Sequence, residues 1–225
     1  MSNTWNLEVA GTVLTLFPER AAFWSETRTA LVADVHLGKD ATFRAEGVSI
    51  PLGSTTSDLE RLSALIERTG AERLIVLGDL YHAAAGMTEQ TERALRAWRS
   101  RHRTLEVVLV RGNHDRSAGR SPQGSDIAEH EDVIVDGPFA FRHVPKAVEG
   151  QYVIAGHVHP GVRVYGDAGQ RERLPCFHAT PSCLVLPAWS EFTGTHSVRP
   201  GPDDEVAVVA GDAVVPLSNE LVRPT

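Results

Sequence analysis

Short runs of residues that bind divalent metals recur in order along this chain. They combine carboxylate, imidazole and amide side chains, which are the ligands that hold zinc, manganese and related ions in proteins. Each of the four longer runs directly follows a stretch of apolar, largely β-branched residues. The runs are Asp34-Val35-His36, Gly78-Asp79, Gly112-Asn113-His114-Asp115, the single His143, and Gly156-His157-Val158-His159.

The number of candidate ligands indicates two metal ions rather than one. A mononuclear site uses about four to six ligands. Seven ligands with one bridging carboxylate fit two ions about 3.5–4 Å apart, the arrangement of phosphatases and nucleases. Such a pair of ions activates water and neutralises charge on phosphoryl oxygens during displacement. The seven candidates are Asp34, His36, Asp79, Asn113, His143, His157 and His159.

The elements before these runs are predicted to be buried strands that meet at one place. Side chains two positions apart in an extended strand project to the same face, which would aim Asp34 and His36 together, and likewise His157 and His159. The glycine before several ligands lets the backbone turn sharply and approach the site closely. The strands are expected over Thr29–Val35, Arg73–Leu77, Leu105–Val110 and Tyr152–Ala155.

The remaining pattern predicts an α/β protein with two packed β-sheets and helices outside them. One helix begins at Thr55 with a capping box to Asp58 and ends at Gly70, and a second covers Thr88–Arg101. Residues 38–54 and 117–125 are expected to be irregular. We expect one domain over residues 1–225, with the motifs in 31–160 and a β-rich part in 161–217.

Composition restricts the partners. The net charge of −7 at pH 7 argues against a protein covered in positive potential for nucleic acid. A local basic stripe is nevertheless present, and two interpretations stay open: a solvated helix face with a loop, or a surface that contacts phosphates. The stripe consists of Arg93, Arg96, Arg99, Arg101, Arg103, Arg111, Arg116 and Arg120.

No apolar run approaches the roughly 20 residues that span a bilayer, and Met1 to Glu8 lack the order of a signal peptide. We therefore expect a cytoplasmic protein without membrane contact. Cys176 and Cys183 are expected to be free, buried thiols rather than a disulfide. Exposed strands in the β-rich part leave a homodimer open.

The ordered motifs resemble the calcineurin-like metallophosphoesterase superfamily from about residue 29 to residue 190. Four segments are most similar to the bacterial ligase-associated DNA damage response endonucleases (PdeM type). The resemblance implies a four-layer αββα sandwich, two divalent ions (manganese first, with iron, zinc or magnesium as alternatives), a DNA substrate, and a ligase or helicase repair system as partner. The segments are Phe17–Arg20, Leu31–Lys39, Phe43–Gly47 and Leu77–His82.

The resemblance also implies residue roles. Asp34, His36 and His159 would hold one ion, and Asp79 would bridge to the second ion, which Asn113, His143 and His157 would hold. His114 would act on the substrate without binding metal, as a phosphate donor or as the acid for the leaving oxygen, because an imidazole titrates near neutrality. Some relatives carry an Asp three positions after the bridging carboxylate to orient this His. The chain has His82 there, so His82 and Asp115 are both candidates for that task.

Substrate contacts and alternatives complete the predictions. Lys39 and Arg44 follow the first ligand run and could bind phosphate oxygens, as could His82, or they could be surface residues.

The leading function is a DNA-cleaving phosphodiesterase, either endonuclease or exonuclease. The alternatives are a phosphohydrolase of small nucleotides or pyrophosphate-linked metabolites, and a catalytically inactive scaffold. The scaffold is disfavoured because all ligands and His114 are present.

Overall fold

The computed structural model describes residues 3–49, 53–165 and 171–217. Its first sheet contains seven strands in chain order, antiparallel from β1 to β4 and parallel from β4 to β7. Short connections give the antiparallel pairs, whereas the parallel strands need crossovers, and all three of these carry helices. The strands are β1 (Trp5–Val9), β2 (Thr12–Phe17), β3 (Ala21–Trp24), β4 (Thr29–Val32), β5 (Arg73–Val76), β6 (Glu106–Val110) and β7 (Ala128–His130).

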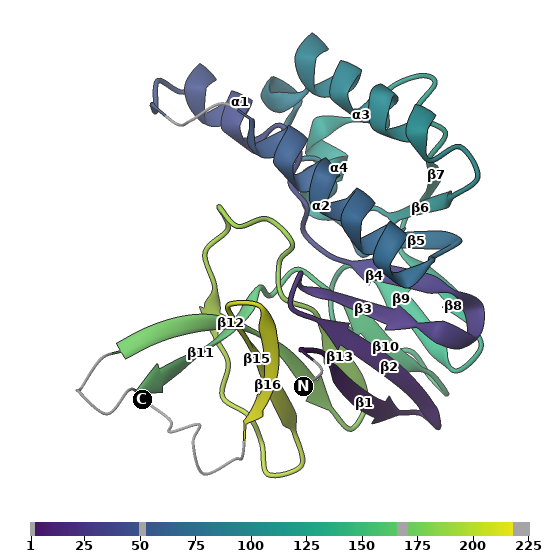
Figure 1. Cartoon of the computed structure of the whole chain (residues 1–225), viewed down its shortest axis with the longest axis vertical. Helices are drawn as coiled ribbons and strands as arrows, with labels where there is room; N and C mark the ends of the chain where they lie inside the picture. The colour runs from purple at the N-terminus through teal and green to yellow at the C-terminus, as the bar shows by residue number, and fades with distance from the viewer. Residues whose placement is uncertain (1–2, 50–52, 166–170, 218–225) are drawn as a thin grey trace.

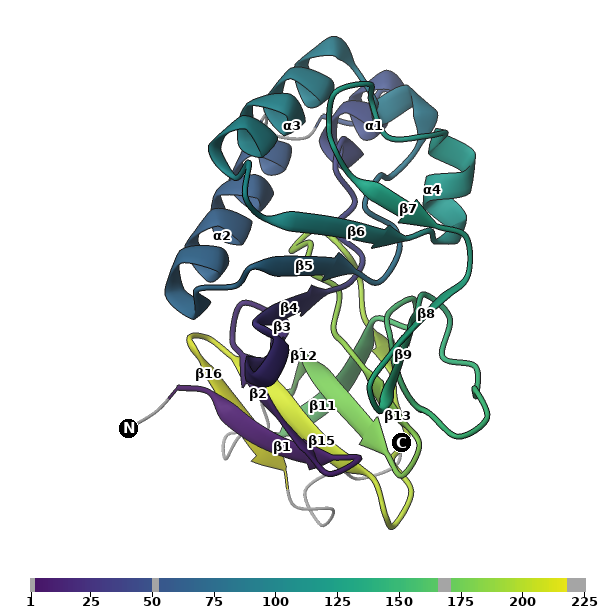
Figure 2. The same cartoon turned by 90° about the vertical axis from the view of Figure 1, so that its right-hand side faces the viewer.

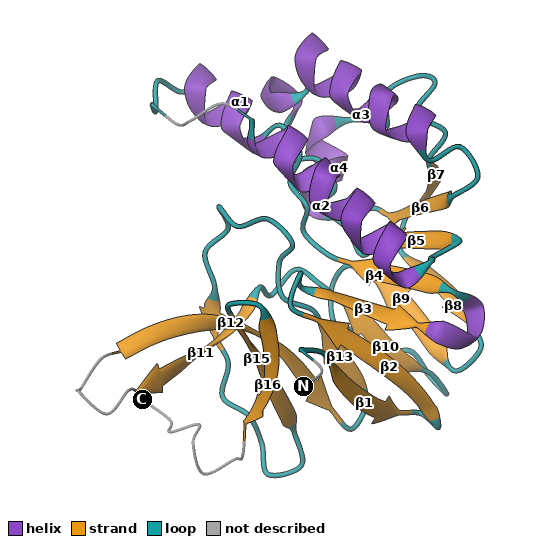
Figure 3. Ribbon diagram, viewed as in Figure 1, coloured by secondary structure: helices purple, strands orange, loops and turns teal. Residues whose placement is uncertain are grey.

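Helices cover one face of this sheet (Figure 3). The buried stripe of α2 (Ser54–Thr69) consists of the expected Leu59, Leu62, Leu65 and Ile66, and α3 (Glu89–Arg101) adds Leu95 and Trp98. Gly70 ends α2 with a left-handed φ of 63°, as predicted. The shorter helices are α1 (Lys39–Ala45), α4 (Asn113–Ala118), η1 (Ser25–Thr27) and η2 (Ala84–Gly86).

The second sheet packs against the opposite face of the first, as Figure 2 shows from the side. Its order is β14-β11-β12-β13-β10-β9-β8, and β15 pairs with β12 and β16. The expected β-rich C-terminal part is therefore present. Its strands are β8 (Val133–Asp136), β9 (Phe139–Arg142), β10 (Tyr152–Ala155), β11 (Pro160–Tyr165), β12 (Arg171–Thr180), β13 (Cys183–Val185), β14 (His196–Ser197), β15 (Glu205–Ala210) and β16 (Ala213–Leu217).

Alternate residues of the parallel strands enter two different cores. Leu31 and Ile75 face the second sheet, where the Trp24 and Phe139 rings meet edge to face at 5.0 Å. Their neighbours Val32 and Val76 face the helices. Because both faces are buried, these strands read as continuous apolar runs rather than as an alternating pattern. The α/β class with two packed sheets is confirmed.

Several local predictions differ from the structure. α1 occupies a segment expected to be irregular, and α4 begins inside the third ligand run. No capping box starts α2, because Gly53 is its N-cap and the Thr55 hydroxyl instead accepts a hydrogen bond from Gly38 N at 2.9 Å. The four α-helices of the described ranges all lie between residues 39 and 118 and pack beside the first sheet, so a helical layer on the second sheet is not seen there.

Cys176 and Cys183 are free thiols on the paired strands β12 and β13, and burial raises the pKa of each to about 12. No helix within the described ranges is long and apolar enough to cross a bilayer.

Candidate metal centre

The ligand runs converge where the two sheets meet. Three of them follow the carboxyl ends of the parallel strands β4, β5 and β6, which share one edge of the first sheet. The other two follow β9 and β10, which are parallel neighbours in the second sheet. Parallel pairing therefore brings residues that are distant in sequence to one cluster. Three groups of three have their ligand atoms within 4.8 Å of one another. Two consist of predicted ligands, namely Asp34, His36 and His159, and Asp79, His143 and His157; the third consists of His36, His82 and His114.

The backbone at five of these residues is left-handed rather than extended. The φ angles are 56° at Asp34, 55° at His36, 52° at Asp79, 69° at His157 and 50° at His159. The expectation that strand alternation aims each Asp or His pair was therefore wrong, because β4 and β10 end before the ligands begin. Left-handed backbone costs an L-residue about 1–2 kcal/mol, and such strain concentrates at functional sites.

The three glycines before ligands are needed for close approach to the site. A Cβ on Gly78 would lie 2.1 Å from His143 Nδ1, and one on Gly112 would lie 2.1 Å from Asp79 Oδ1. A Cβ on Gly156 would lie 2.7 Å from Asp34 Oδ2. Any side chain at these positions would displace a candidate ligand.

Several electron-pair donors converge around His143. Its Nδ1 lies 3.0 Å from the Leu77 carbonyl oxygen, which assigns the ring proton to Nδ1 and leaves a lone pair on Nε2. That Nε2 lies 3.0 Å from Asn113 Oδ1, 3.0 Å from His157 Nδ1 and 3.4 Å from Asp79 Oδ2. Oxygen and nitrogen acceptors that gather in this way suit a divalent cation.

The Asp34 group shows the same property. One oxygen of Asp34 accepts a hydrogen bond from His157 N at 2.9 Å, which orients the carboxylate. The other, Oδ1, lies 3.4 Å from His159 Nε2, and both atoms are buried without a hydrogen-bond partner in the described part of the chain. Buried polar atoms are rarely left unpaired. The residues therefore fit a cation bound between them.

Burial sets the charge state of the site. Burial, with the neighbouring Asp34 carboxylate, raises the pKa of Asp79 to about 6. Burial and then the Lys39 ammonium lower the pKa of His36 to about 2, and burial likewise lowers the pKa values of His143 and His157. The imidazoles are therefore neutral and can donate lone pairs, while the adjacent carboxylates require positive charge nearby.

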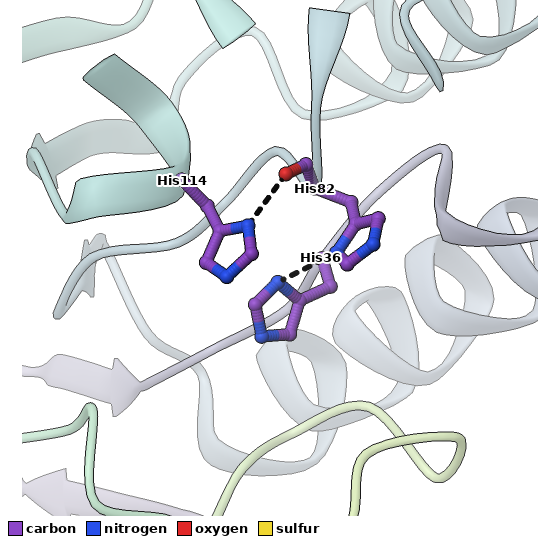
Figure 4. A group of neighbouring side chains, drawn as sticks. All are labelled: His36, His82 and His114. Atoms are coloured by element: carbon purple, nitrogen blue, oxygen red, sulfur yellow. Dashed lines mark hydrogen bonds between the residues drawn. The ribbon is translucent and has the colours of Figure 1, made fainter. Parts of the chain in front are cut away.

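His114 lies beside the ligands with its ring held by a backbone carbonyl. Its Nδ1 donates to the His82 carbonyl oxygen at 2.7 Å, as Figure 4 shows. The His82 ring stacks on it at 5.0 Å, and His82 Nδ1 lies 3.5 Å from His36 Nδ1. Of the two candidates for orienting His114, His82 makes the contact, and it does so through its main chain.

Asp115 has a different task, which the sequence did not reveal. It is fully buried, and its carboxylate accepts hydrogen bonds from three backbone N–H groups: Asp79 at 2.7 Å, Tyr81 at 2.9 Å and Gly112 at 2.8 Å. It thereby fastens the loop after β5 to the loop after β6. Asp115 was a candidate to orient His114; it positions the backbone of Asp79 instead.

The predicted substrate contacts separate in space. Lys39 is half-buried near the cluster and donates from Nζ to Thr193 Oγ1 at 3.0 Å. His82 lies against His36 and His114. Arg44 instead pairs with Asp40 at 3.5 Å and lines a small cavity of about 20 Å³ between α1, α2 and α3.

Most arginines of the basic stripe are buried or paired with acidic side chains, whereas Arg101 and Arg103 are exposed. Arg99 is 4% exposed and donates to backbone carbonyls such as Ser125 O, at 2.9 Å. Arg111 is buried as well, between Glu129 and Glu131. Arg93, Arg96, Arg116 and Arg120 are paired with acidic side chains. Arg99 and Arg111 are therefore neither on a solvated face nor free to contact phosphate, and a phosphate contact by the exposed arginines stays a prediction.

Comparison with known proteins agrees with this geometry. The family model of the calcineurin-like phosphoesterases matches residues 27–205. Among solved structures, the nuclease MPE of Pseudomonas putida is similar at a TM-score of 0.83 and 38% identity, covering 96% of this chain and 100% of that chain. No curated protein matches the sequence.

Two other structures are far less similar and carry no argument. The phosphoesterase Yfce of E. coli has 12% identity and a TM-score of 0.41, covering 87% of this chain and 99% of that one. The Aquifex aeolicus protein AQ665 has 16% identity and a TM-score of 0.40, covering 58% and 78%. On the family match, the nuclease likeness and the clustered ligands, the chain belongs to the calcineurin-like phosphoesterases and is a metal-dependent phosphoesterase.

Proposed function

We propose that the protein is a two-metal phosphodiesterase that cleaves DNA, with manganese as its ion. The observation that carries this proposal is a pair of neighbouring clusters of metal-ligand side chains, one around Asp34 and one around His143. In the Asp34 cluster, Asp34 Oδ1 and His159 Nε2 are buried without a hydrogen-bond partner in the described part of the chain. The name of the similar Pseudomonas putida protein, a nuclease, supports a phosphodiester in nucleic acid. A role beside a ligase or helicase in DNA repair rests on the subgroup resemblance.

In this proposal the two clusters hold one ion each. Asp34, His36 and His159 would hold the first ion. Asn113, His143 and His157 would hold the second, and Asp79 would bridge the two, as the family resemblance implies. The His114 N–H orients the Asp79 carboxylate by donating to Oδ1 at 2.9 Å, and Asp79 Oδ2 lies 3.4 Å from His143 Nε2. When bound, the ions would activate water and offset charge on the phosphoryl oxygens.

The protein's own groups would complete the reaction. The His82 carbonyl holds the Nδ1 proton of His114, so the second ring nitrogen, Nε2, is the atom that can give a proton. Protonated His114 would donate from Nε2 to the oxygen that leaves when the phosphodiester bond breaks. Lys39 would contact a non-bridging phosphate oxygen, since its ammonium group lies near the cluster: it is 5.9 Å from the Phe43 ring centroid, and that ring lies 5.8 Å from the His82 ring.

The test begins with protein stripped of metal by a chelator. Mn²⁺ is titrated against bis(p-nitrophenyl) phosphate, the matching monoester, end-labelled single- and double-stranded DNA, and nucleoside diphosphates and triphosphates. We expect Mn²⁺-dependent turnover of the diester and of DNA, and loss of both in Asp79→Asn. Turnover of nucleotides without DNA cleavage would favour the small-substrate alternative. The ion-paired arginines are the structural observation that favours that alternative. No metal-dependent turnover of any substrate would contradict the proposal.

A further inference from the structure

The loop that joins β13 to β14, residues 186–195, is hydrogen-bonded to the ligand runs near both of its ends. At its start, Trp189 N donates to Ala33 O at 2.8 Å and Ser190 N to Asp34 O at 3.3 Å. At its end, His196 N donates to His159 O at 2.9 Å. Asp34 and His159 belong to one ligand group, so residues 191–195 must cross beside that group. Figure 1 shows this loop, in yellow-green, rising toward α1.

The middle of this loop is joined to α1. Lys39, the first residue of α1, donates from Nζ to Thr193 Oγ1 at 3.0 Å. The same ammonium lies 5.9 Å from the Phe43 ring centroid, and Phe43 lies 5.8 Å from His82. The contact of Lys39 with Thr193 therefore places residue 192 on the rim of the site where α1 and the loop meet.

Residue 192 is a phenylalanine with a ring that is largely in solvent. Phe192 is 56% exposed and is the one aromatic residue among the exposed large apolar side chains of the described ranges. An exposed aromatic ring in a loop that is hydrogen-bonded to the candidate ligand runs is available to a ligand that has an apolar face. The other exposed large side chains are the valines Val13, Val48, Val133, Val135, Val144 and Val215.

We propose that Phe192 stacks on a nucleobase next to the scissile phosphate and makes the enzyme prefer a polynucleotide over a bare sugar–phosphate chain. The inference rests on the proposed nuclease function and adds the substrate contact that the ligand runs do not provide. Arg93, Arg96 and Arg120 are paired with acidic side chains within the protein, whereas an exposed aromatic ring has no such partner and is open to a base. Stacking on an aromatic ring suits every base, which fits cleavage without sequence preference.

The test compares two substrates of equal length with the Mn²⁺-loaded enzyme. One is a single-stranded oligonucleotide, and the other is the same phosphodiester chain with tetrahydrofuran residues in place of nucleosides. Stacking of a base is worth about 5- to 150-fold. Phe192→Ala should lower kcat/KM by that factor for the base-bearing strand and leave the abasic strand unchanged, while Phe192→Trp should keep the wild-type preference.

A matched control and a binding readout complete the design. Val13→Ala truncates a side chain that is 45% exposed on β2, away from the site, and should change neither substrate. Fluorescence anisotropy of a labelled oligonucleotide with the His114→Ala background should show weaker binding for the Phe192→Ala double variant. Equal losses on both strands would overturn the inference. No loss on either strand would also overturn it, and would indicate instead that Phe192 contacts a protein partner. Failure of the proposed function would appear differently, as a wild-type enzyme that cleaves neither strand.

Discussion

At the scale of single residues, the site is built on strained backbone that hydrogen bonds hold in place. The left-handed Asp34 and His36 donate from their N–H groups to Gly78 O at 3.1 Å and to Asp79 O at 2.9 Å. The Asp34 and Asp79 carboxylates each accept a backbone hydrogen bond from another ligand run, from His157 N and His114 N respectively. Each run therefore fixes another, and the fold tolerates a cost of about 1–2 kcal/mol per left-handed residue for the sake of the site.

A pair of glycine substitutions separates backbone strain from blockage of the site. Gly78 and Gly47 have nearly the same φ, 81° and 84°, but a Cβ at Gly78 meets His143 at 2.1 Å while one at Gly47 meets nothing within 4 Å. Both alanine variants should lose about 1–2 kcal/mol of unfolding free energy from the left-handed backbone. Gly78→Ala should in addition lose bound metal and turnover. Metal content by mass spectrometry and urea titration measure the two effects, and equal metal content in both variants would contradict the blockage.

His114 offers a test of its proposed role as an acid. His114→Ala should keep its metal and lose about 10²–10⁴-fold in kcat on DNA, for which the leaving group is a basic alkoxide. The loss should be much smaller with bis(p-nitrophenyl) phosphate, because nitrophenolate leaves without a proton. His130→Ala, an exposed histidine on β7, serves as the control. The same loss on both substrates would indicate contact with the phosphate and not protonation of the leaving oxygen.

At the scale of elements, charged side chains that look like surface groups join neighbouring segments. Asp115 links the loops after β5 and β6 through three backbone hydrogen bonds. Arg99 links α3 to the loop before β6 and to the loop before β7, with hydrogen bonds to His102 O, Leu105 O and Ser125 O. The sequence of α3 suggests a basic, solvated face, but in the structure α3 packs against its neighbours and buries Arg99.

The stability of two arginine variants distinguishes these roles. Arg99→Ala should cost about 2–4 kcal/mol of unfolding free energy, because three carbonyl groups lose a charged donor in a buried place. Arg93→Ala removes only an exposed pair with Glu89 at i, i+4 and should cost about 0.2–0.5 kcal/mol. Urea unfolding measures both. DNA cleavage should be unchanged in Arg93→Glu, and a clear loss would revive the basic stripe as a DNA contact.

At the scale of the whole molecule, the candidate ligands come from both sheets. Asp34, Asp79 and Asn113 follow strands of the first sheet, whereas His143 and His157 follow strands of the second. The sheets also share the apolar core in which Trp24 and Phe139 meet. A cation bound between these groups would hold the two sheets together in addition to taking part in catalysis.

Metal removal should therefore lower the stability of the whole fold. Mn²⁺ at about 100 times its dissociation constant should stabilise the protein by about 2.7 kcal/mol per site, or a rise in Tm of about 5–10 °C. Differential scanning calorimetry with chelator and with Mn²⁺ measures this shift. Asp79→Asn should show a smaller shift, because it loses a carboxylate shared by the ligands. An identical Tm with and without metal in the wild type would show that no ion binds the folded state.

The sequence by itself determined the local identity of the elements and the chemistry of the ligands. Apolar runs predicted the strands that precede Asp34, Asp79 and Asn113, because parallel strands buried on both faces must be apolar throughout. The period of the buried leucines predicted α2, and Gly70 predicted its end. The glycines before Asp79, Asn113 and His157 indicated close approach, and a Cβ there would displace a candidate ligand.

Tertiary structure alone decided how those residues meet. Left-handed backbone at Asp34 and His36 replaced the predicted alternation, because hydrogen bonds to the neighbouring run outweigh the local preference for extended chain. The burial of Arg99 and the attachment of the loop that carries Phe192 to Ala33, Asp34 and His159 depend on contacts between segments far apart in sequence. Composition and periodicity report what each segment prefers, whereas the surface on which a charge or an aromatic ring lies is set by which segments pack together.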